Sequence, residues 1–329
     1  MEYYLQKKKI IKNREMGNFT FKGLFLAGLF MVLGCLSIQA ADDDGLITKQ
    51  ITIKLEKAGT LPDKIGSTKK KQITNLKIIG EINGTDLRMI REMAGRDVNG
   101  RGTDGMLSVL DLSDAKIVEG GDYYYFNGHS DYYILTGHND CFTSNDKIGD
   151  SAFESCSGLT SITLPSGVTE IGKFAFLHCS GLTSITLPSG LTEISSSAFK
   201  SCSGLTSLTL PSGLTEIGYS AFKSCSGLTS LTLPSGLTEI SSSAFSGCSG
   251  LTSITLPSGV TMIYSSAFES CSGLTSIALP SGLTEIGVNA FSGCSGLTSI
   301  YVYAEKLPNM GSDVFDGCDA KKCTVYVPK

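Results

Sequence analysis

Seven cysteines recur at a fixed interval of 23 residues, and their thiols are the most regularly placed reactive groups in the sequence. They are Cys156, Cys179, Cys202, Cys225, Cys248, Cys271 and Cys294. Equivalent thiols of successive repeats share one environment, whereas a disulfide needs two Cα atoms about 4.4–6.8 Å apart in a suitable orientation. No histidine recurs at the same period to complete a metal site. We therefore predict a buried, reduced ladder of structural cysteines, with a disulfide framework as the alternative.

The remaining cysteines and the histidines complete no recognisable site. Cys318 and Cys323 fall outside the 23-residue period, so they are the candidate disulfide pair of this sequence. His129, His138 and Cys141 are of zinc-ligand types, but their spacing matches no standard zinc site and a fourth ligand is not evident. We therefore predict no bound metal at these residues.

A glycine-rich segment at residues 97–104 has some features of a calcium loop. It contains aspartate, asparagine and threonine, but Arg101 stands where an oxygen ligand is needed, and the terminal glutamate is missing. An ordinary turn is the simpler interpretation. The sequence also lacks the G-x-S-x-G, H-E-x-x-H and phosphate-loop motifs. We therefore predict a protein that is not an enzyme and needs no cofactor.

An aromatic segment interrupts the regular pattern between residues 119 and 146. Its candidate ligand-binding residues are Tyr123, Tyr124, Tyr125, Phe126, Tyr132 and Tyr133. Tyrosine provides amphipathic contact area at a low cost in side-chain entropy, and long loops on rigid scaffolds often carry binding function. The alternative is that the rings pack on the first repeat as a hydrophobic lid. Alanine substitutions at Tyr124 and Tyr132 would separate a loss of stability from a loss of binding.

Two rows of hydroxyl side chains recur with the same period as the cysteines. The threonine row, which ends on a tyrosine, consists of Thr163, Thr186, Thr209, Thr232, Thr255 and Tyr301. A serine row runs beside it from Ser161 to Ser276. A flat hydroxyl surface suits a carbohydrate or an ice surface, although a neutral, solvated strand face has the same composition. The threonines and Tyr301 are therefore candidate ligand contacts.

A third row is acidic. It consists of Glu170, Glu193, Glu216, Glu239 and Glu285, with Met262 in place of one glutamate. Carboxylates stacked about 5 Å apart on neighbouring strands repel each other by less than about 1 kcal/mol in water. The row is either a cation-binding stripe or, as we expect, a solvated face that discourages aggregation at strand edges.

The elements that position these rows follow from the repeat itself. Each unit resembles C-S-G-L-T-S-I-T-L-P-S-G-L-T-E-I-x-x-S-A-F-x-x, and a fixed period of this length is typical of a solenoid. The L-x-x-I-x-L segment alternates as a strand, P-S-G ends it, L-T-E-I forms a second short strand, and S-A-F packs on the return leg. One unit cannot bury enough apolar surface to offset the entropy of ordering it, so the copies must stack.

The motif L-x-x-I-x-L-P-x-x-[VL]-x-x-I-x-x-x-A-F-x-x-C extends from about Lys147 to Cys318. It resembles the 23-residue leucine-rich repeat of BspA-like bacterial surface proteins. Segments 76–93 and 107–113 are similar to the region that precedes such repeats in secreted proteins of Gram-negative anaerobes. The resemblance implies a right-handed, curved solenoid with a parallel β-sheet on its concave face. It also implies binding or adhesion, with no fixed functional residues to transfer.

The N-terminus is predicted to be an export signal. A basic segment precedes an apolar run at 23–36, which small residues and an acidic stretch follow. This order is typical of a secretory signal, cleaved after Ala40 or, alternatively, lipidated at Cys35. The predicted organisation is a signal peptide at 1–40, an α/β cap at 41–106, a repeat array at 107–318 with an insertion at about 119–146, and a capping strand at 319–329.

Within the cap, a strand is expected at 47–55, a solvated turn at Lys69–Lys71, and a helix that ends at Met93 and is capped by Thr85 or Asp86. Residues 107–112 already have the strand spacing of the repeat, so they predict a degenerate first coil that the insertion interrupts.

Composition narrows the function further. The net charge is −4 without a basic stripe, which excludes a nucleic-acid partner, and 41% hydrophobic residues exclude a disordered chain. We predict a β-rich leucine-rich-repeat solenoid with a small α/β cap, secreted or on the outer cell surface. It would bind an extracellular protein or glycan and contact a membrane only through a lipid anchor at Cys35. The alternatives are a carbohydrate-binding protein that uses the Ser/Thr face, and a structural spacer.

Overall fold

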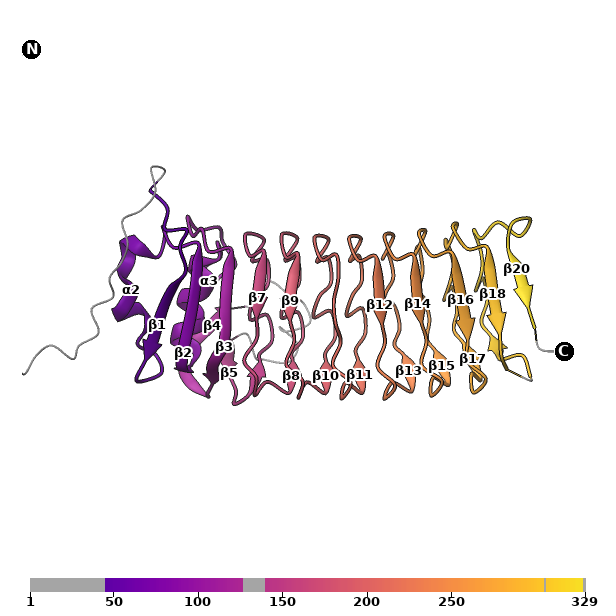
Figure 1. Ribbon diagram of the computed structural model, residues 1–329, viewed down its shortest axis with the longest axis horizontal. Helices are drawn as coiled ribbons and strands as arrows, with labels where there is room; N and C mark the ends of the chain where they lie inside the picture. The colour runs from indigo at the N-terminus through magenta and orange to yellow at the C-terminus, as the bar shows by residue number, and fades with distance from the viewer. Residues whose placement is uncertain (1–44, 127–139, 305, 328–329) are drawn as a thin grey trace, which may run out of the picture. The chain divides into compact units, whose positions relative to one another are not determined.

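The 23-residue repeat folds into one coil of a parallel β-solenoid. A computed structural model describes residues 45–126, 140–304 and 306–327, which belong to one compact unit. Its coils follow one another along a common axis, with the helices at the N-terminal end of the array (Figure 1). The predicted fold class, a β-rich leucine-rich-repeat solenoid with a small α/β cap, is confirmed.

All coils but one contribute a strand to a first row of parallel strands in the described residues, which we call the strand face. Its strands are β1 (Ile51–Leu55), β2 (Asn75–Ile82), β3 (Val109–Ile117), β7 (Ser161–Thr163), β9 (Ser184–Thr186), β12 (Ser230–Thr232), β14 (Ser253–Thr255), β16 (Ser276–Leu279), β18 (Ser299–Val302) and β20 (Thr324–Tyr326). Neighbouring strands keep the repeat register, so Ile162 lies opposite Ile185 and both point into the core. Leu110 of β3 lies opposite Ile162, which is the register expected of a degenerate first coil.

A second, shorter strand in each coil carries the glutamate row. These strands are β6 (Lys147–Ile148), β8 (Glu170–Ile171), β10 (Glu193–Ile194), β11 (Glu216–Ile217), β13 (Glu239–Ile240), β15 (Met262–Ile263), β17 (Glu285–Ile286) and β19 (Asn309–Met310). Their isoleucines are buried and the residues before them lie at or near the surface, because side chains alternate along a strand.

The return leg of each coil forms a third column, which we call the Ala-Phe ladder. Here an N–H of one coil donates to a carbonyl of the next, as Phe176 does to Ala198 at 2.7 Å, and the pattern runs unbroken from Phe153 to Val314. The phenylalanines stack in parallel, with ring centroids 5.2 Å apart at Phe153–Phe176 and 5.4 Å apart at Phe291–Phe315. Burial of one large aromatic ring per coil is a major part of the core.

The two strand rows are interrupted in the middle of the array, whereas the Ala-Phe ladder is continuous. Residues 207–209 form no strand and are joined to the next coil by a single bridge, Ser207–Ser230. Leu208 and Leu231 stand here at a position that isoleucine holds in the other repeats. Leucine lacks the β-branch that favours a strand, which gives a physical reason for the weaker pairing.

The cap contains a helix that the sequence did not reveal. The sequence predicts only a solvated turn at Lys69–Lys71, but α2 (Leu61–Lys69) immediately precedes and overlaps it. Pro62 is tolerated because it lies in the first turn, and Gly66, at φ 72°, kinks the helix. These two residues obscure the regular helical pattern in the sequence. The expected strand at 47–55 is confined to β1 and to an isolated bridge at Ile47.

The second helix, α3 (Gly84–Met93), ends as predicted but is capped by a different residue. The Asn83 side chain accepts from the Thr85 N–H at 3.1 Å, and the Asp86 carboxylate accepts from the Asn83 N–H at 3.0 Å. This is a capping box, so the prediction of Thr85 or Asp86 as the cap is wrong by two or three residues. Asp86 also accepts from the Leu61 N–H at 2.9 Å and thereby joins α3 to α2.

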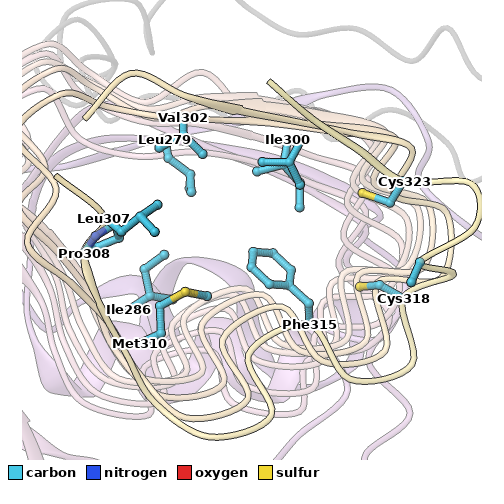
Figure 2. Close-up of a pocket in the computed structure, with 12 residues that line it drawn as sticks. Leu279, Ile286, Ile300, Val302, Leu307, Pro308, Met310, Phe315, Cys318 and Cys323 are labelled. Carbon is cyan, nitrogen blue, oxygen red and sulfur yellow. The ribbon is translucent and has the colours of Figure 1, made fainter. Parts of the chain in front are cut away.

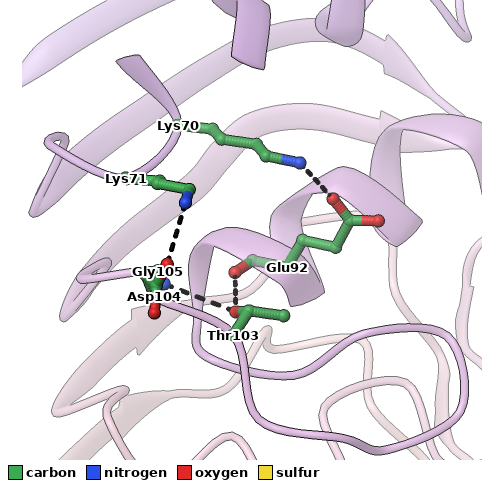
Figure 3. Close-up of polar contacts among 6 residues, drawn as sticks. All are labelled: Lys70, Lys71, Glu92, Thr103, Asp104 and Gly105. Atoms are coloured by element: carbon green, nitrogen blue, oxygen red, sulfur yellow. Dashed lines mark hydrogen bonds and ion pairs between the residues drawn. The ribbon is translucent and has the colours of Figure 1, made fainter. Parts of the chain in front are cut away.

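The loop after α3 is tied to both helices (Figure 3). Lys70 forms an ion pair with Glu92 at 2.6 Å, and Lys71 forms one with Asp104 at 2.8 Å. The Thr103 hydroxyl donates to the Glu92 carbonyl at 2.6 Å. The loop is therefore a structural part of the cap.

The insertion forms an antiparallel hairpin against the first coil. Its strands are β4 (Gly120–Phe126) and β5 (Asp140–Thr143), and β4 lies beside α3. Across the described ranges of the chain, no helix combines the length and apolarity needed to span a membrane.

Candidate functional site

The tyrosines of the insertion lie at the N-terminal end of the Ala-Phe ladder. Tyr124 and Tyr125 are buried, and Phe126 is exposed. Tyr123 is half-buried and packs edge-to-face with Phe142, with ring centroids 6.3 Å apart. Tyr132 and Tyr133 lie outside the described residues. Of the two interpretations of this segment, the burial of Tyr124 and Tyr125 supports a lid, because neither ring presents a surface to a ligand.

The hydrogen bonds of Tyr124 show what this lid does. In the array, the carbonyls of Lys173, Ala175 and Leu177 accept from N–H groups of the coil before them. The equivalent carbonyls of the first coil are those of Asp150, Ala152 and Glu154. No earlier coil of the repeat supplies N–H donors to them within the described residues. The Tyr124 hydroxyl donates to the first of them, the Asp150 carbonyl, at 2.8 Å. A side chain thus takes the place of a missing backbone donor.

Arg91 of α3 serves the other two carbonyls. Its guanidinium donates to the Ala152 carbonyl at 3.0 Å and to the Glu154 carbonyl at 3.4 Å, and it also reaches the Ser151 carbonyl at 2.7 Å. Arg91 is buried, with its guanidinium carbon 4.4 Å from the centroid of the Tyr125 ring. Burial, with the Glu154 charge beside it, raises the pKa of the Tyr125 hydroxyl, so Tyr125 is held neutral.

Sequence reasoning missed Arg91. The available signal was a single arginine within a helix whose neighbouring residues Leu87, Ile90 and Met93 all face the core. A charge on an apolar face needs a partner, and here the partners are main-chain carbonyls.

The seven periodic cysteines lie in the core as a column beside the Phe stack. All seven are buried and unpaired, and from Cys179 to Cys294 each thiol donates to the carbonyl of the phenylalanine 26 residues earlier, as Cys179 does to Phe153 at 3.0 Å. Burial raises the pKa of the Cys225 thiol to about 12. Because the thiolate is the form that attacks electrophiles and binds metals, such a thiol is chemically inert at neutral pH.

The metal candidates gain no support from the described residues. In this part of the chain, no cluster of three or more His, Cys, Asp and Glu side chains is placed to hold a metal ion. His129 and His138 lie outside the described residues. In the loop at 97–104, the Asp97 carboxylate accepts from the N–H groups of Asn99 and Arg101, both at 2.8 Å, so it stabilises the turn.

The predicted threonine row lies on the outer side of the strand face. Thr186, Thr209, Thr232 and Thr255 are exposed and Thr163 is half-buried. Among the described residues, no hydrogen bond occupies these five hydroxyls. By contrast, the threonines that precede each strand, such as Thr183, donate to the carbonyl of the coil before, which makes them structural. The hydroxyls of the threonine row are therefore available to a ligand, while the β-branched side chains also suit the strands that carry them.

The strand face is hollowed where its pairing is interrupted. A cavity of about 470 Å³ opens there, lined by hydroxyls of Ser207, Thr209, Ser230 and Thr232 and by apolar atoms of Leu210, among others. It combines hydrogen-bonding groups with an apolar floor, which is the usual composition of a small-ligand or side-chain pocket.

The threonine row ends in a cluster of exposed tyrosines. Tyr301 lies opposite Tyr326 on the next strand, and the two rings stack with centroids 4.7 Å apart. Tyr303 follows β18 directly, and its side chain is 58% exposed. Sequence reasoning identified Tyr301 but missed Tyr303 and Tyr326. Tyr326 lies 25 residues after Tyr301, so it falls outside the 23-residue period. The alternation of Tyr with Val in both segments was the available signal.

The glutamate row is in register, with Glu193 directly between Glu170 and Glu216. Lys147 forms an ion pair with Glu170 at the N-terminal end of the row. Burial and then the neighbouring glutamates, Glu193 first, raise the pKa of Glu216. The row is therefore an electrostatic cost to the fold.

The stacked coils, periodic core and parallel strand face define a leucine-rich-repeat solenoid. The BspA-type leucine-rich repeat region matches residues 140–238 and 215–327, which together make up more than half of the chain. The chain belongs to this family.

Solved structures with related sequences include three bacterial proteins. A leucine-rich cell surface protein from Faecalibacterium prausnitzii is 39% identical over 50% of this chain and 45% of that chain, with a TM-score of 0.48. A leucine-rich repeat protein of T. pallidum is 39% identical over 45% of this chain and 69% of that one, with a TM-score of 0.43. One from Bacteroides ovatus is 29% identical over 58% and 61%, with a TM-score of 0.43.

The chain therefore spans less than half the length of the F. prausnitzii protein and less than two thirds of the B. ovatus protein. Among curated proteins, none matches the chain significantly.

Proposed function

We propose that this protein is an exported, non-enzymatic binding or adhesion module that contacts its partner through the strand face. The observation that carries the proposal is the threonine row, whose exposed hydroxyls serve no hydrogen bond among the described residues and which leads into the tyrosine cluster. The remaining conspicuous side chains have structural duties: Tyr124 and Arg91 close the ladder, and the cysteines fill the core. The export signal that the sequence predicts at 1–40 supports a location of this surface outside the cell.

A glycan is the partner class that the chemistry of this surface favours. Hydroxyls both donate and accept hydrogen bonds, which suits the hydroxyls of a sugar. The stacked rings of Tyr301 and Tyr326 add an apolar, amphipathic platform at the end of the row. An extracellular protein that binds the same platform is the second candidate, because exposed tyrosines are frequent anchors of protein interfaces.

The proposal is tested by screening the purified chain on glycan and extracellular-matrix protein arrays and then measuring the affinity of any hit with variants. Tyr301→Ala combined with Tyr326→Ala removes the platform, and Thr209→Lys with Thr232→Lys alters the hollow. We expect either pair to weaken binding by at least about tenfold, which is about 1.4 kcal/mol.

Tyr219→Ala is the matched control, because Tyr219 is 55% exposed but lies on the return leg, away from the strand face. Binding that is lost with Tyr219→Ala and unaffected by the strand-face variants would overturn the proposal. Unchanged melting temperatures in all variants ensure that the readout is recognition and not folding.

A further inference from the structure

The hollow in the strand face lies where two neighbouring coils have lost most of their strand pairing. Residues between 207 and 212 of one coil and between 230 and 234 of the next line it, and its volume is about 470 Å³. Within the described residues, the Ser207–Ser230 bridge is the one strand pairing between these two segments. Small-ligand sites usually have volumes of about 300–1,000 Å³, so the hollow is large enough for a small ligand.

The lost pairing leaves main-chain groups without partners along the hollow. In the first repeats, the Leu164 N–H donates to the Thr186 carbonyl at 3.1 Å, but the equivalent Leu210 N–H and Thr232 carbonyl form no hydrogen bond in the described residues. The Thr232 N–H and the Leu208 carbonyl, which strand alternation directs at each other, are also unpaired there. Main-chain polar groups without a protein partner bond water or a ligand. The hollow thus offers two donors and two acceptors at fixed positions.

Side chains add more polar groups around an apolar floor. The hydroxyls of Ser207, Thr209 and Ser230 line the hollow, and each can both donate and accept a hydrogen bond. Leu208 and Leu210, which are 8% and 9% exposed, supply the apolar part of the lining. A ligand that matches this surface combines several hydroxyl groups with a small apolar face.

The surroundings of the hollow are electrically neutral. Every residue that lines it is serine, threonine, leucine or proline. The charged residues of these two coils, residues 202–247, are Glu216, Lys223 and Glu239. The glutamates lie on β11 and β13 in the second strand row, and Lys223 lies on the return leg. A charged ligand would lose hydration in the hollow without gaining an opposite charge, so the hollow favours a neutral one.

We propose that the hollow binds one neutral hexopyranose residue of a glycan, and that the main-chain groups of Leu208, Leu210 and Thr232 recognise its hydroxyls. This inference rests on the proposed function and narrows it from glycans in general to neutral sugars at a defined site. The C–H face of the ring would pack on the two leucines. Because main-chain groups have fixed positions, sugars that differ in the orientation of one hydroxyl should bind with unequal affinity.

An extended peptide suits these main-chain groups less well than a sugar. A strand inserted between the two walls would separate them by two strand spacings of about 4.8 Å each. The Ser207–Ser230 bridge and the hydrogen bond from the Thr229 N–H to the Thr206 carbonyl, at 3.3 Å, instead join the coils directly. On the return leg, the Phe222 ring centroid lies 5.3 Å and 5.6 Å from those of the neighbouring coils. The hollow therefore suits a compact ligand that enters from the surface.

Amide hydrogen exchange and NMR titration of the purified chain test the proposal, with the methyl glycosides of glucose, galactose and mannose as probes. In the free protein, the Leu210 and Thr232 amides should exchange at least about tenfold faster than the amide of Thr255, the equivalent of Thr232 in a paired strand. At least one neutral glycoside should slow both amides and shift their resonances. Glucuronic acid at the same concentration should not.

Substitutions locate the response. Thr232→Trp fills the hollow and should weaken glycoside binding by at least about tenfold, without a fall in melting temperature because Thr232 is exposed. Thr163→Trp is the matched control, since Thr163 belongs to the threonine row but lies on β7, which pairs with β3 and β9. Tyr301→Ala with Tyr326→Ala should leave glycoside binding unchanged, because these rings lie on the last two strands of the strand face.

Several results would overturn the inference. These are slow exchange of Leu210 and Thr232 equal to that of Thr255, no response of these amides to any neutral glycoside, and equal affinity for glucuronic acid. Binding that survives Thr232→Trp, or protection of these amides by an extended peptide in place of the glycosides, has the same consequence. A partner on the arrays that still depends on the strand face would then keep the proposed function, so the two failures are distinguishable.

Discussion

The two ends of the described array differ in how their terminal backbone groups and phenylalanine rings are covered. Both cut through three columns of backbone hydrogen bonds and through the Phe stack. At the N-terminal end, Phe153 is buried, and side chains of Tyr124 and Arg91 replace the donors of a missing coil. At the C-terminal end, Phe315 borders a cavity and the ladder N–H groups have no acceptor in the described residues.

The difference teaches that covering an array requires polar as well as apolar complementarity. An unpaired buried carbonyl costs about 1–3 kcal/mol, comparable with the gain from burying one large side chain. The N-terminal cap meets both needs through residues far apart in sequence. The last described coil meets neither, because Phe315 borders a cavity (Figure 2) and the ladder N–H groups have no acceptor in the described residues.

The largest effect is expected where the same residue type closes the Phe stack at either end. Phe153→Ala should lower the free energy of unfolding by about 3–5 kcal/mol, because it leaves a cavity in a closed core. Phe315→Ala should lower it by no more than about 1–2 kcal/mol, since the ring already borders open space. Urea unfolding at concentrations below any self-association measures both. Equal losses would mean that the C-terminal end is as well packed as the N-terminal one.

A second prediction concerns the donors of Arg91. Arg91→Met keeps the length and apolar volume but leaves the Ala152 and Glu154 carbonyls without donors, so we expect a loss of about 3 kcal/mol. Arg88→Met on the same helix is the control, because Arg88 is half-buried and its guanidinium carbon lies 5.6 Å from the centroid of the Tyr123 ring. A loss of about 0.5–1 kcal/mol is expected there. If Arg91→Met cost no more than the control, the guanidinium would not be a substitute for the missing coil.

Removal of a single hydroxyl gives a smaller and cleaner effect. Tyr124→Phe retains the ring and deletes only the donor to the Asp150 carbonyl, so stability should fall by about 1–2 kcal/mol. Tyr303→Phe at the other end should change it by less than about 0.5 kcal/mol, because this side chain is exposed. Amide exchange adds a local readout, since the first coil should lose protection in Tyr124→Phe. Protection that is unchanged there would contradict the capping role.

The array could be predicted from the sequence because each coil repeats the same strand, turn and core residues at the same positions. Ile185 alternates with polar neighbours, Pro188 ends the strand, and Phe199 returns to the core 23 residues after Phe176. A period in the sequence becomes a period in space, so the outward direction of the threonine row followed without any long-range information.

The closures at the ends could not be predicted in the same way. Arg91 contacts carbonyls about 60 residues away, at Ser151 and Ala152, and no periodicity links them. A tyrosine at position 124 is compatible with both a lid and a ligand contact. The two interpretations are distinguished by the burial of Tyr124 and by its hydrogen bond to the Asp150 carbonyl. Likewise, the stack of Tyr326 on Tyr301 depends on the longer final coil, which breaks the register that the sequence suggests.

The smallest predicted effect compares the ends of the glutamate row with its interior. Lys147 faces Glu170 at the N-terminal end, and Asn309 faces Glu285 at the C-terminal end, whereas Glu216 has glutamate neighbours. Burial and these neighbours raise the pKa of Glu216, so the folded state holds its proton more tightly than the unfolded state. Its ionisation therefore opposes folding as the pH rises from the ordinary carboxyl range through the raised pKa.

Glu216→Gln should consequently stabilise the protein at neutral pH by about 0.2–1 kcal/mol, the cost of like charges directly opposite on neighbouring strands. The gain should disappear on acidification below about pH 4, where the wild-type carboxyl is protonated. Glu285→Gln is the control, because its strand neighbours are the uncharged Met262 and Asn309. Melting temperatures of the two variants across this pH range decide the matter. A gain at Glu285 equal to that at Glu216 would show that repulsion along the row is uniform, and that the ends of the row are not relieved by their neutral or basic neighbours.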